Sequence, residues 1–429
     1  MKLINQIKQS QRQIRTSSSL SNLIKNATTL TKLTTSQLLS SSNQTDHLLN
    51  QTQVDPFKLL SPELKKLNLN LSSLLGSNQI KLDQVAKYYL SPSTDSKHLR
   101  PLIVLLVSKA TANLSPTYPH HLHSFQLDIN QSISPHSILT DHNPSASSSN
   151  PLNDPSSSSI LPSQHRLAEI SEMIHVASLL HDDVIDKASS RRSIPSAPHE
   201  FGNKLSILAG DFLLARASIG LARLGSLEVV ELISSIISNL VEGELMQLNS
   251  NGKSNHQIWN EYLEKSYLKT ASLMAKTARC ATVLGGCGIH QGWEEGEKIK
   301  DGVYQFGKHL GIAFQIIDDV LDYTSSASVL GKPSGGSDLK LGIATAPILY
   351  ASEQFPELNE LINRKFNLEG DVERAQELVH RSNGISRSIE LAQKYSNEAR
   401  EFLKQSGIPE NEARIGLEKL SWMVIDRVK

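Results

Sequence analysis

Two short clusters of aspartates are the strongest chemical feature of the sequence. The first reads His-Asp-Asp-Val-Ile-Asp over residues 181–186 and ends a long apolar stretch. In a helix, Asp182 and Asp186 lie on one face, where two like charges repel each other. Stability alone would not select such a pair, whereas a divalent cation bound between the carboxylates would remove the repulsion. Mg²⁺ fits this role, because it takes oxygen ligands, retains waters and is commonly shared between carboxylates and phosphates.

The second cluster repeats this spacing 136 residues later, as Asp-Asp-Val-Leu-Asp over residues 318–322. It again follows an apolar stretch, residues 311–317. A single cluster could be a solvated acidic helix end, but two copies, each ending an apolar helix, argue against that alternative. The Asp-x-Asp-x-Asp-Gly loop of an EF-hand is absent. If the two clusters face each other across a cavity, they would hold several Mg²⁺ ions around one diphosphate.

Basic and hydroxyl side chains that could meet diphosphates accompany both clusters. Guanidinium groups offer forked donors that match phosphate oxygens, whereas a lysine ammonium acts as a point charge. Each residue alone is more often a surface charge, but together they carry enough positive charge for two diphosphates. The candidates are Lys97, Arg100, Arg191, Arg192, Lys269 with Thr270, and Lys332.

Helices must position these residues, because from about Leu60 the apolar residues recur at spacings of three and four with little alternation. Runs of β-branched residues bounded by turns are almost absent, which indicates an all-α fold. The expected helices span residues 82–91, 99–112, 166–186, 204–223, 226–248, 256–284, 294–322, 341–353, 371–378, 385–405 and about 410–427.

Residues 113–163 break the helical pattern. They hold fourteen serines and seven of the 17 prolines but no Lys or Arg, a composition that buries too little apolar surface to offset the entropy of ordering. We therefore predict a disordered insertion within one domain. His120, His121 and His123 lie in it, but without a rigid scaffold they are a poor metal site.

The N-terminal residues 1–50 differ in composition from the rest of the chain. They carry six basic residues and one acid, Asp46, with abundant Ser and Thr and apolar residues at roughly helical spacing. This composition is typical of an organelle transit peptide, with the mitochondrion favoured over the plastid; the alternative is a disordered tail without an address. Without residues 1–50, the formal net charge of zero becomes about −5 (37 basic against 42 acidic).

Overall composition excludes several classes of protein. The equal numbers of acidic and basic residues, 43 of each, argue against a nucleic-acid-binding protein held by bulk charge. The absence of a long uninterrupted apolar run argues against a membrane-spanning helix. Only two cysteines, Cys280 and Cys287, are present, so a disulfide framework and a cysteine-rich zinc module are excluded.

With these motifs, the chain resembles the trans-polyprenyl diphosphate synthase family from about residue 80 to the C-terminus, outside the insertion. The resemblance rests on both aspartate clusters, Gly202-Asn203-Lys204, Ala209-Gly210-Asp211, Lys269-Thr270-Ala271, Gly331-Lys332-Pro333 and Asp338-Leu339. It implies an isoprenoid synthase-type helical bundle around a deep central cavity, formed by residues 51–429. It also implies a Mg²⁺-dependent prenyltransferase of isoprenoid biosynthesis, which joins isopentenyl diphosphate to an allylic diphosphate, farnesyl or geranylgeranyl.

The resemblance also assigns roles to individual residues. The metal ligands, for three Mg²⁺ ions per site, would be Asp182, Asp183, Asp186, Asp318, Asp319 and Asp322, and the catalytic residues Asp182, Asp186, Lys269 and Asp318. The residues around the allylic diphosphate would be Arg191, Lys269, Thr270, Gln315 and Lys332. Those of the isopentenyl diphosphate site would be Lys97, Arg100, His175 and Arg192. The family's Gly-Gly-Lys-Arg-x-Arg-Pro reads Asp-Ser-Lys-His-Leu-Arg-Pro here, over residues 95–101, which makes the isopentenyl diphosphate site the weakest part of this transfer.

Chain length is argued from helix periodicity. A growing tail below the first cluster must pass the side chains one turn back, and these are the small residues Ala177 and Ser178. They leave the upper cavity open, so we expect a product of about C30–C50, because a bulky residue one helical turn below the cluster would close the cavity near C15–C20. The alternative is that Ala177 only packs against a neighbouring helix.

A long product together with a transit peptide suggests the ubiquinone side chain, made in the mitochondrial matrix, with peripheral association with the inner membrane for product release. The family leads us to expect a homodimer or a related heteromer, and no nucleic-acid partner. Three alternatives remain: a shorter-chain geranylgeranyl diphosphate synthase, a non-catalytic partner subunit of a heteromeric synthase, and a class I terpene cyclase. Both aspartate clusters are complete, which argues against the last two.

Overall fold

Almost all of the described chain is helical. The computed structural model describes residues 54–90, 98–124, 129, 133–134, 159–191, 194–248, 255–287, 292–324 and 336–428, and Val54–Lys429 form one compact unit. Among these residues the strands are β1 (Ser190–Arg191) and β2 (Ile194–Pro195), which form one antiparallel hairpin. The predicted all-α class is confirmed.

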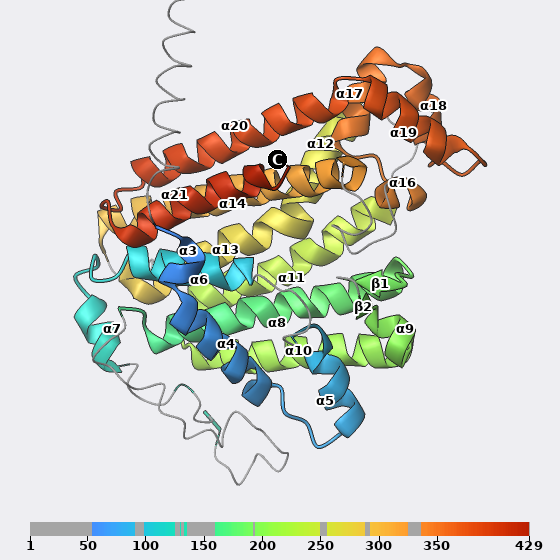
Figure 1. Cartoon of the computed structure of the whole chain (residues 1–429). Coiled ribbons are helices and arrows are strands. Elements are labelled where there is room, and N and C mark those ends of the chain that lie inside the picture. The colour runs from blue at the N-terminus through green and yellow to red at the C-terminus, as the bar shows by residue number, and fades with distance from the viewer. Residues whose placement is uncertain are drawn as a thin grey trace, which may run out of the picture. The chain divides into compact units, whose positions relative to one another are not determined.

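The helical elements are labelled in Figure 1. In chain order they are α3 (Pro56–Leu59), α4 (Ser61–Leu74), α5 (Ile80–Lys87), η1 (Tyr88–Leu90), α6 (Leu99–Ala110), α7 (Tyr118–Ser124), α8 (Pro162–Ile185), α9 (Ala197–Phe201), α10 (Asn203–Arg223), α11 (Leu227–Leu248), α12 (Asn255–Ser266), η3 (Tyr267–Ala271), α13 (Ser272–Thr282), η4 (Val283–Cys287), α14 (Glu294–Thr324), α16 (Ser337–Lys340), α17 (Ala346–Gln354), α18 (Glu357–Asn363), α19 (Asp371–Arg381), α20 (Gly384–Gln405), α21 (Glu412–Ile425) and η6 (Asp426–Val428).

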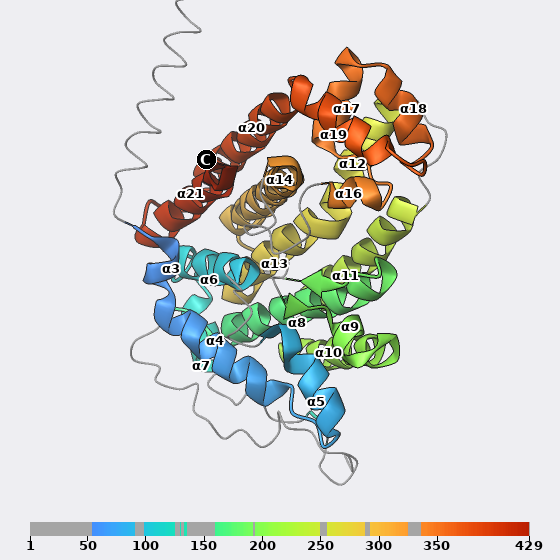
Figure 2. The same cartoon turned by 45° about the vertical axis from the view of Figure 1, so that its right-hand side comes forward.

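The long helices build the core. Helix α14 packs between α13 and the α20–α21 pair, and α13 also contacts α8 and α11 (Figures 1 and 2). Helix α8 begins with Pro162, whose missing N–H is harmless in the first turn of a helix, and it is buried along most of its length. As a result, the aspartate-bearing C-terminal ends of α8 and α14 are carried by two well-packed helices.

A π-helical turn, η3, interrupts the helix between α12 and α13. It spans Tyr267–Ala271, so Lys269 and Thr270 lie within it. Such single π turns inside helices are frequent at functional sites, because they redirect side chains relative to a regular helix. The sequence predicts one continuous helix over 256–284 and gives no sign of this turn.

Glycines of α14 allow it to approach η3 and α13 closely. A Cβ on Gly311 would lie 2.5 Å from the Cα of Ala271, and one on Gly307 would lie 2.8 Å from the Cα of Ala275. Both contacts are with backbone atoms, which cannot move aside as a flexible side chain does. This close crossing brings Gln315 of α14 next to Thr270 of η3.

Replacing Gly311 with alanine should therefore lower the free energy of unfolding by about 1–3 kcal/mol, because the added methyl group forces the two helices apart. A matched control is Gly220→Ala in α10, where the new Cβ would be 3.4 Å from Ile170, an ordinary contact. That variant should be neutral or stabilised by up to about 1 kcal/mol, from helix propensity. Urea unfolding measures both; equal effects would show that the crossing is not tight.

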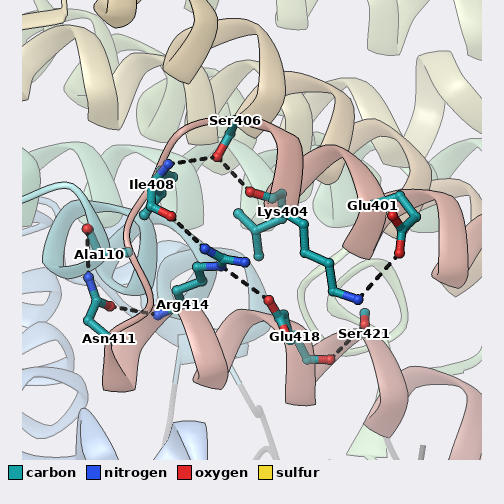
Figure 3. Close-up of polar contacts among 10 residues, drawn as sticks. Ala110, Glu401, Lys404, Ser406, Ile408, Asn411, Arg414, Glu418 and Ser421 are labelled. Atoms are coloured by element: carbon teal, nitrogen blue, oxygen red, sulfur yellow. Dashed lines mark hydrogen bonds and ion pairs between the residues drawn. The ribbon is translucent and has the colours of Figure 1, made fainter. Parts of the chain in front are cut away.

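The connection between α20 and α21 is fixed by side-chain caps (Figure 3). Asn411 accepts a 2.9 Å hydrogen bond from the backbone N–H of Arg414 and donates one of 3.0 Å to the carbonyl of Ala110 at the end of α6. The Arg414 guanidinium donates to the carbonyl of Ile408 at 2.6 Å and to Glu418 at 3.2 Å. These bonds anchor α21, and with it the C-terminal turn η6, against the bundle.

The described chain departs from the predicted insertion at its first residues. Tyr118–Ser124 form α7, the Tyr118 ring is buried, and its hydroxyl donates to the carbonyl of Ser159 at 2.6 Å. The Ser115 hydroxyl donates to the carbonyl of Gly286 at 2.9 Å. Ser115 and Tyr118 therefore pack against the domain, and this first part of the predicted insertion is ordered. Most of 125–158, and all of the predicted transit peptide, lie outside the described residues.

One helix of the described chain, Asn203–Arg223 (α10), is long and apolar enough to cross a membrane by length and composition. Core helices of soluble proteins pass the same test, so this property alone is weak support for a membrane span. The helix packs along α8 and α5, and its outer face carries the exposed side chains Ile207 and Leu208.

Candidate active site

A cavity of about 270 Å³ lies where α8, α11, the α12–η3 segment, α14 and α16 meet. Nine of the residues to which the sequence assigns a role in the site line it: Arg100, His175, Ser178, Asp182, Asp186, Lys269, Thr270, Gln315 and Asp319. They come from segments up to 219 residues apart, between Arg100 and Asp319. The structure thus brings most of the predicted site together in one place.

Asp182 and Asp186 face this cavity from the last turns of α8. Burial raises the pKa of Asp182 to about 6, and the nearby carboxylates of Glu244 and Asp186 also raise it, while Lys269 and Arg191 lower it. Burial also raises the pKa of Asp186. No described residue donates a hydrogen bond to either carboxylate, so their oxygens remain available to a ligand in the cavity.

Asp183, between them, points into the protein. It has no exposed surface, and it does not line the cavity. It accepts hydrogen bonds from the Tyr89 hydroxyl at 2.5 Å and from Arg191 Nε at 2.7 Å, and it forms an ion pair with Arg191 Nη2 at 2.6 Å. The three aspartates of this cluster therefore differ sharply in their surroundings.

The second cluster is engaged mainly with protein partners. Asp319 is buried and accepts hydrogen bonds from the Tyr262 hydroxyl at 2.7 Å and from the Gln315 amide at 2.8 Å. Burial, with the nearby Asp338 carboxylate, raises its pKa. Asp322 accepts from the backbone N–H of Asp338 at 3.2 Å.

Asp318, the first residue of this cluster, lies at the C-terminal turn. Its carboxylate forms a 2.7 Å ion pair with Arg427 of η6, whose guanidinium also lies 4.7 Å from the centre of the Phe314 ring. Asp318 is not among the residues that line the cavity. In this conformation it is turned toward the chain's own C-terminal end.

The predicted diphosphate-binding residues form short polar chains along the wall of the cavity. Lys269 forms an ion pair with Glu244 at 2.5 Å and donates to Gln247 at 3.1 Å. The Thr270 hydroxyl donates to the side-chain carbonyl of Gln315 at 2.6 Å, and that amide in turn donates to Asp319. These contacts with neighbouring side chains hold Lys269 and Thr270 in place.

Arg100 and His175 meet at the edge of the cavity, with Arg100 Nη1 and His175 Nε2 3.0 Å apart. Next to them, His98 stands where the family has an arginine. It adopts a positive φ of 44° and turns its ring inward, 2.9 Å from Glu172. The residue that replaces the family's arginine is thus directed into the core rather than toward the cavity.

Sequence reasoning missed several cavity residues. Lys265 and Tyr262 lie one and two turns before Lys269 on the same helical face, so spacings of four and three could have revealed them. Burial lowers the pKa of Lys265, and Lys269 lowers it too, while Asp319, Asp338 and Glu244 raise it. Glu244, the ion-pair partner of Lys269, has no sequence spacing that would have revealed it, because only the fold brings it next to Lys269.

Other predicted residues are not found at the cavity. Ala177 is fully buried and does not line it, unlike its neighbour Ser178. Lys97, Arg192 and Lys332 lie outside the described residues. Within the described part of the chain, no group of three or more His, Cys, Asp or Glu residues is arranged closely enough to hold a metal ion.

The family assignment follows from comparison with known proteins. Residues 79–379 match the polyprenyl synthetase family. The chain belongs to this family. Within it, the chain is 50% identical to the probable mitochondrial hexaprenyl pyrophosphate synthase of Neurospora crassa, over 88% of this chain and 82% of that protein. It is 40% identical to the mitochondrial hexaprenyl pyrophosphate synthase of Saccharomyces cerevisiae, over 87% of this chain and 91% of that protein.

Solved structures of the polyprenyl synthetase fold agree. The heptaprenyl diphosphate synthase of Staphylococcus aureus superposes with a TM-score of 0.68 at 26% identity, over 86% of this chain and 99% of that one. The polyprenyl synthase of Caulobacter crescentus, solved with calcium and isoprenyl diphosphate, gives a TM-score of 0.67 at 26% identity, over 87% of this chain and 97% of that one. The resemblance read from the sequence is confirmed, as is the isoprenoid synthase fold.

Proposed function

We propose that this polyprenyl synthetase is a Mg²⁺-dependent trans-prenyltransferase that joins isopentenyl diphosphate to an allylic diphosphate, farnesyl or geranylgeranyl. The observation that carries the proposal is the convergence of α8 and α14 on one cavity, with Asp182 and Asp186 on one wall and Gln315 and Asp319 on another. Lys265 and Lys269, from the α12–η3 segment, line the same cavity. A cavity lined by both acidic and basic groups suits a metal–diphosphate complex better than it suits a metal ion or a diphosphate alone.

The residues present fit magnesium. Asp182 and Asp186 offer carboxylate oxygens that accept no hydrogen bond from the described chain, and burial, together with the nearby Glu244 carboxylate, raises the pKa of both groups. An all-oxygen ligand set of this kind favours Mg²⁺ over softer metals. We propose that these two, together with Asp318, hold the ions, three per site. Asp318 must then exchange its partner Arg427 for a cation.

The chain's own residues account for the binding steps. Bound Mg²⁺ supplies positive charge that stabilises the departing diphosphate. Lys269 and Arg191 add donors to that group, and Thr270, held by Gln315, presents a hydroxyl beside it. When the allylic C–O bond breaks, the cation left behind is attacked by the double bond of isopentenyl diphosphate to form the new C–C bond. The proton then lost passes to the released diphosphate.

Arg100 and His175 are the described residues that we assign to isopentenyl diphosphate. They meet at the edge of the cavity, on the side of α6 and α8, and together offer a guanidinium and an imidazole to a second diphosphate. Lys97, Arg192 and Lys332 keep their sequence-based roles as further diphosphate donors. His98, turned toward Glu172, takes no part in this proposal.

The direct test of the reaction is pyrophosphate release, measured with the chain lacking residues 1–50. We expect release only when isopentenyl diphosphate, an allylic diphosphate and Mg²⁺ are all present, and its loss when a chelator is added. Release from the allylic diphosphate alone would instead indicate a cyclase or a hydrolase. No release with any primer would favour a non-catalytic partner subunit.

The pKa of Asp182 predicts how magnesium binding depends on pH. Because this carboxyl is protonated below about pH 6, protons compete with Mg²⁺ there, and lowering the pH weakens binding. From about pH 7.5 to about pH 5.5, the Mg²⁺ concentration for half-maximal pyrophosphate binding should rise roughly fourfold from this group alone. Calorimetry at each pH measures it. The Asp182→Asn variant should lose this part and keep the parts due to Asp186 and to pyrophosphate itself; identical profiles would contradict the assignment.

We further propose a long-chain product, about C30–C50 by the helical-turn argument, which supplies the ubiquinone side chain in the mitochondrion. Relatives named as mitochondrial hexaprenyl pyrophosphate synthases support this. For assembly we propose a homodimer, or a heteromer with a related chain, formed through α10 and α11. Their outer faces expose the large apolar side chains Ile207, Leu208, Val241 and Leu245, which a partner chain could cover. Matrix location with peripheral inner-membrane association is part of the same proposal.

A further inference from the structure

Lys265 is a cavity residue to which the sequence assigns no role. It lies near the end of α12, one turn before Lys269, and its half-buried side chain lines the cavity. Among the described residues, none forms a hydrogen bond or an ion pair with its ammonium group. A cation that is withdrawn from water without a partner is costly, and such groups are concentrated at functional sites. An anion in the cavity would supply the missing partner.

The neighbouring lysine, Lys269, is held by α11. It forms an ion pair with Glu244 at 2.5 Å and donates to Gln247 at 3.1 Å. Its stem runs against the same helix, since a Cβ on Gly243 would lie 2.7 Å from Lys269 Cγ. An ammonium group has three donors. Two of those of Lys269 are thus engaged with α11, whereas all three of Lys265 remain for a ligand.

The alternative role for Lys265 is that of a counter-ion for the second aspartate cluster. Burial lowers the pKa of Lys265, while Asp319 and Asp338 raise it, so both carboxylates lie near its ammonium group. The oxygens of Asp319, however, accept from the Tyr262 hydroxyl at 2.7 Å and from the Gln315 amide at 2.8 Å. The buried carboxylate therefore has donors of its own, and its place in the structure does not depend on the lysine.

We propose that Lys265 is a substrate-binding residue, which donates to the allylic diphosphate from the wall that carries the second aspartate cluster. This inference rests on the proposed function and deepens it. As the allylic C–O bond breaks, both of its electrons remain on the diphosphate, and Lys265 stays protonated and stabilises the added charge. The leaving group is then met by two lysines one helical turn apart, Lys269 beside Glu244 and Lys265 near Asp319.

Inorganic pyrophosphate binding, measured by calorimetry on the full chain at saturating Mg²⁺, tests this contact. Lys265→Met keeps the length of the side chain and removes its charge, so it should weaken binding at least about tenfold, the loss expected for a hydrogen bond between charged groups. Lys265→Arg keeps a charge and donors and should remain within about threefold of wild type. Unchanged pyrophosphate binding in Lys265→Met would overturn the proposal.

Lys276 on α13 provides the matched control. It is also a half-buried lysine, and it donates to the Ser235 hydroxyl at 2.8 Å, but it does not line the cavity. Lys276→Met should therefore bind pyrophosphate within about twofold of wild type. If this variant lost as much affinity as Lys265→Met, the effect would come from net charge rather than from a contact, and the proposal would fail.

Steady-state kinetics distinguish the two diphosphates. Lys265→Met should lower kcat at least about tenfold, because negative charge grows on the leaving group in the transition state. The KM for isopentenyl diphosphate should stay within about twofold of wild type, since that diphosphate does not leave. A raised KM for isopentenyl diphosphate with unchanged kcat would assign the lysine to the other substrate and overturn the proposal.

The free energy of unfolding tests the counter-ion role. In urea and without ligand, Lys265→Met should be as stable as wild type or more stable, because it removes a charge that has no close partner in the protein. A loss of stability would show that Lys265 is needed to neutralise the second cluster, which contradicts the proposal. All of these results differ from failure of the proposed function, which would appear as a wild-type chain that forms no elongated product.

Discussion

Asp182→Asn should lower kcat about 10²–10³-fold, the loss typical of removing one preorganised group that stabilises charge in the transition state. The asparagine keeps the size of the side chain but loses the negative charge that would hold a cation beside the diphosphate. Asp182 faces the cavity, and no described residue donates a hydrogen bond to it, so the substitution breaks no contact within the protein. Steady-state assays at saturating Mg²⁺ measure the loss.

A carboxylate outside the cavity provides the control. Asp301 on α14 is exposed and forms an ion pair with Arg279. Asp301→Asn should keep kcat within about twofold of wild type, since surface ion pairs contribute little to stability. If Asp182→Asn kept near wild-type kcat, the metal would not be held at the end of α8, and the proposed reaction would lose its main support.

Ser178→Phe should shorten the product from about C30–C50 to about C15–C20. Ser178 lies one helical turn, about 6 Å, below Asp182 and borders the cavity. A phenyl ring there would close the space into which the growing tail extends. Reversed-phase separation of the labelled products, after removal of the diphosphate, measures the change.

Ala177→Phe is the comparison within this experiment. The two positions point about 100° apart on α8, and Ala177 is fully buried and does not line the described cavity. We expect shortening here too, but less than at Ser178. Unchanged product length in both variants would remove the argument that small residues on α8 set the chain length, and would place the floor on another helix.

Helical periodicity and the aspartate spacing were sufficient to predict the fold class and most of the cavity. Long, mostly buried helices such as α8 and α14 carry a strong apolar signal, and a spacing of four places Asp182 and Asp186 on one face whatever the tertiary structure. The sequence does not predict helix α4, although Leu67, Leu71 and Leu74 recur at helical spacing and are buried, because Asn and Ser between them weaken the pattern.

What the sequence could not reveal depends on partners distant along the chain. The Asp-Asp-x-x-Asp motif treats its first two aspartates alike, yet Asp183 is distinguished by Tyr89, 94 residues away. Glu244 becomes part of the site only through Lys269, and that lysine is placed by a π turn that depends on packing against α11 and α14. The pattern of residues around one position in the sequence gives no information about which distant residue that position will contact.

The most direct test of the account is the size of the product. The chain lacking residues 1–50 is incubated with Mg²⁺, farnesyl diphosphate and labelled isopentenyl diphosphate, and the dephosphorylated products are separated by length. The account predicts all-trans products of about C30–C50, since Ser178, which borders the cavity one turn below the first cluster, is small. Products that stop at about C20 would contradict the long-chain assignment, and the absence of any elongation would contradict the prenyltransferase itself.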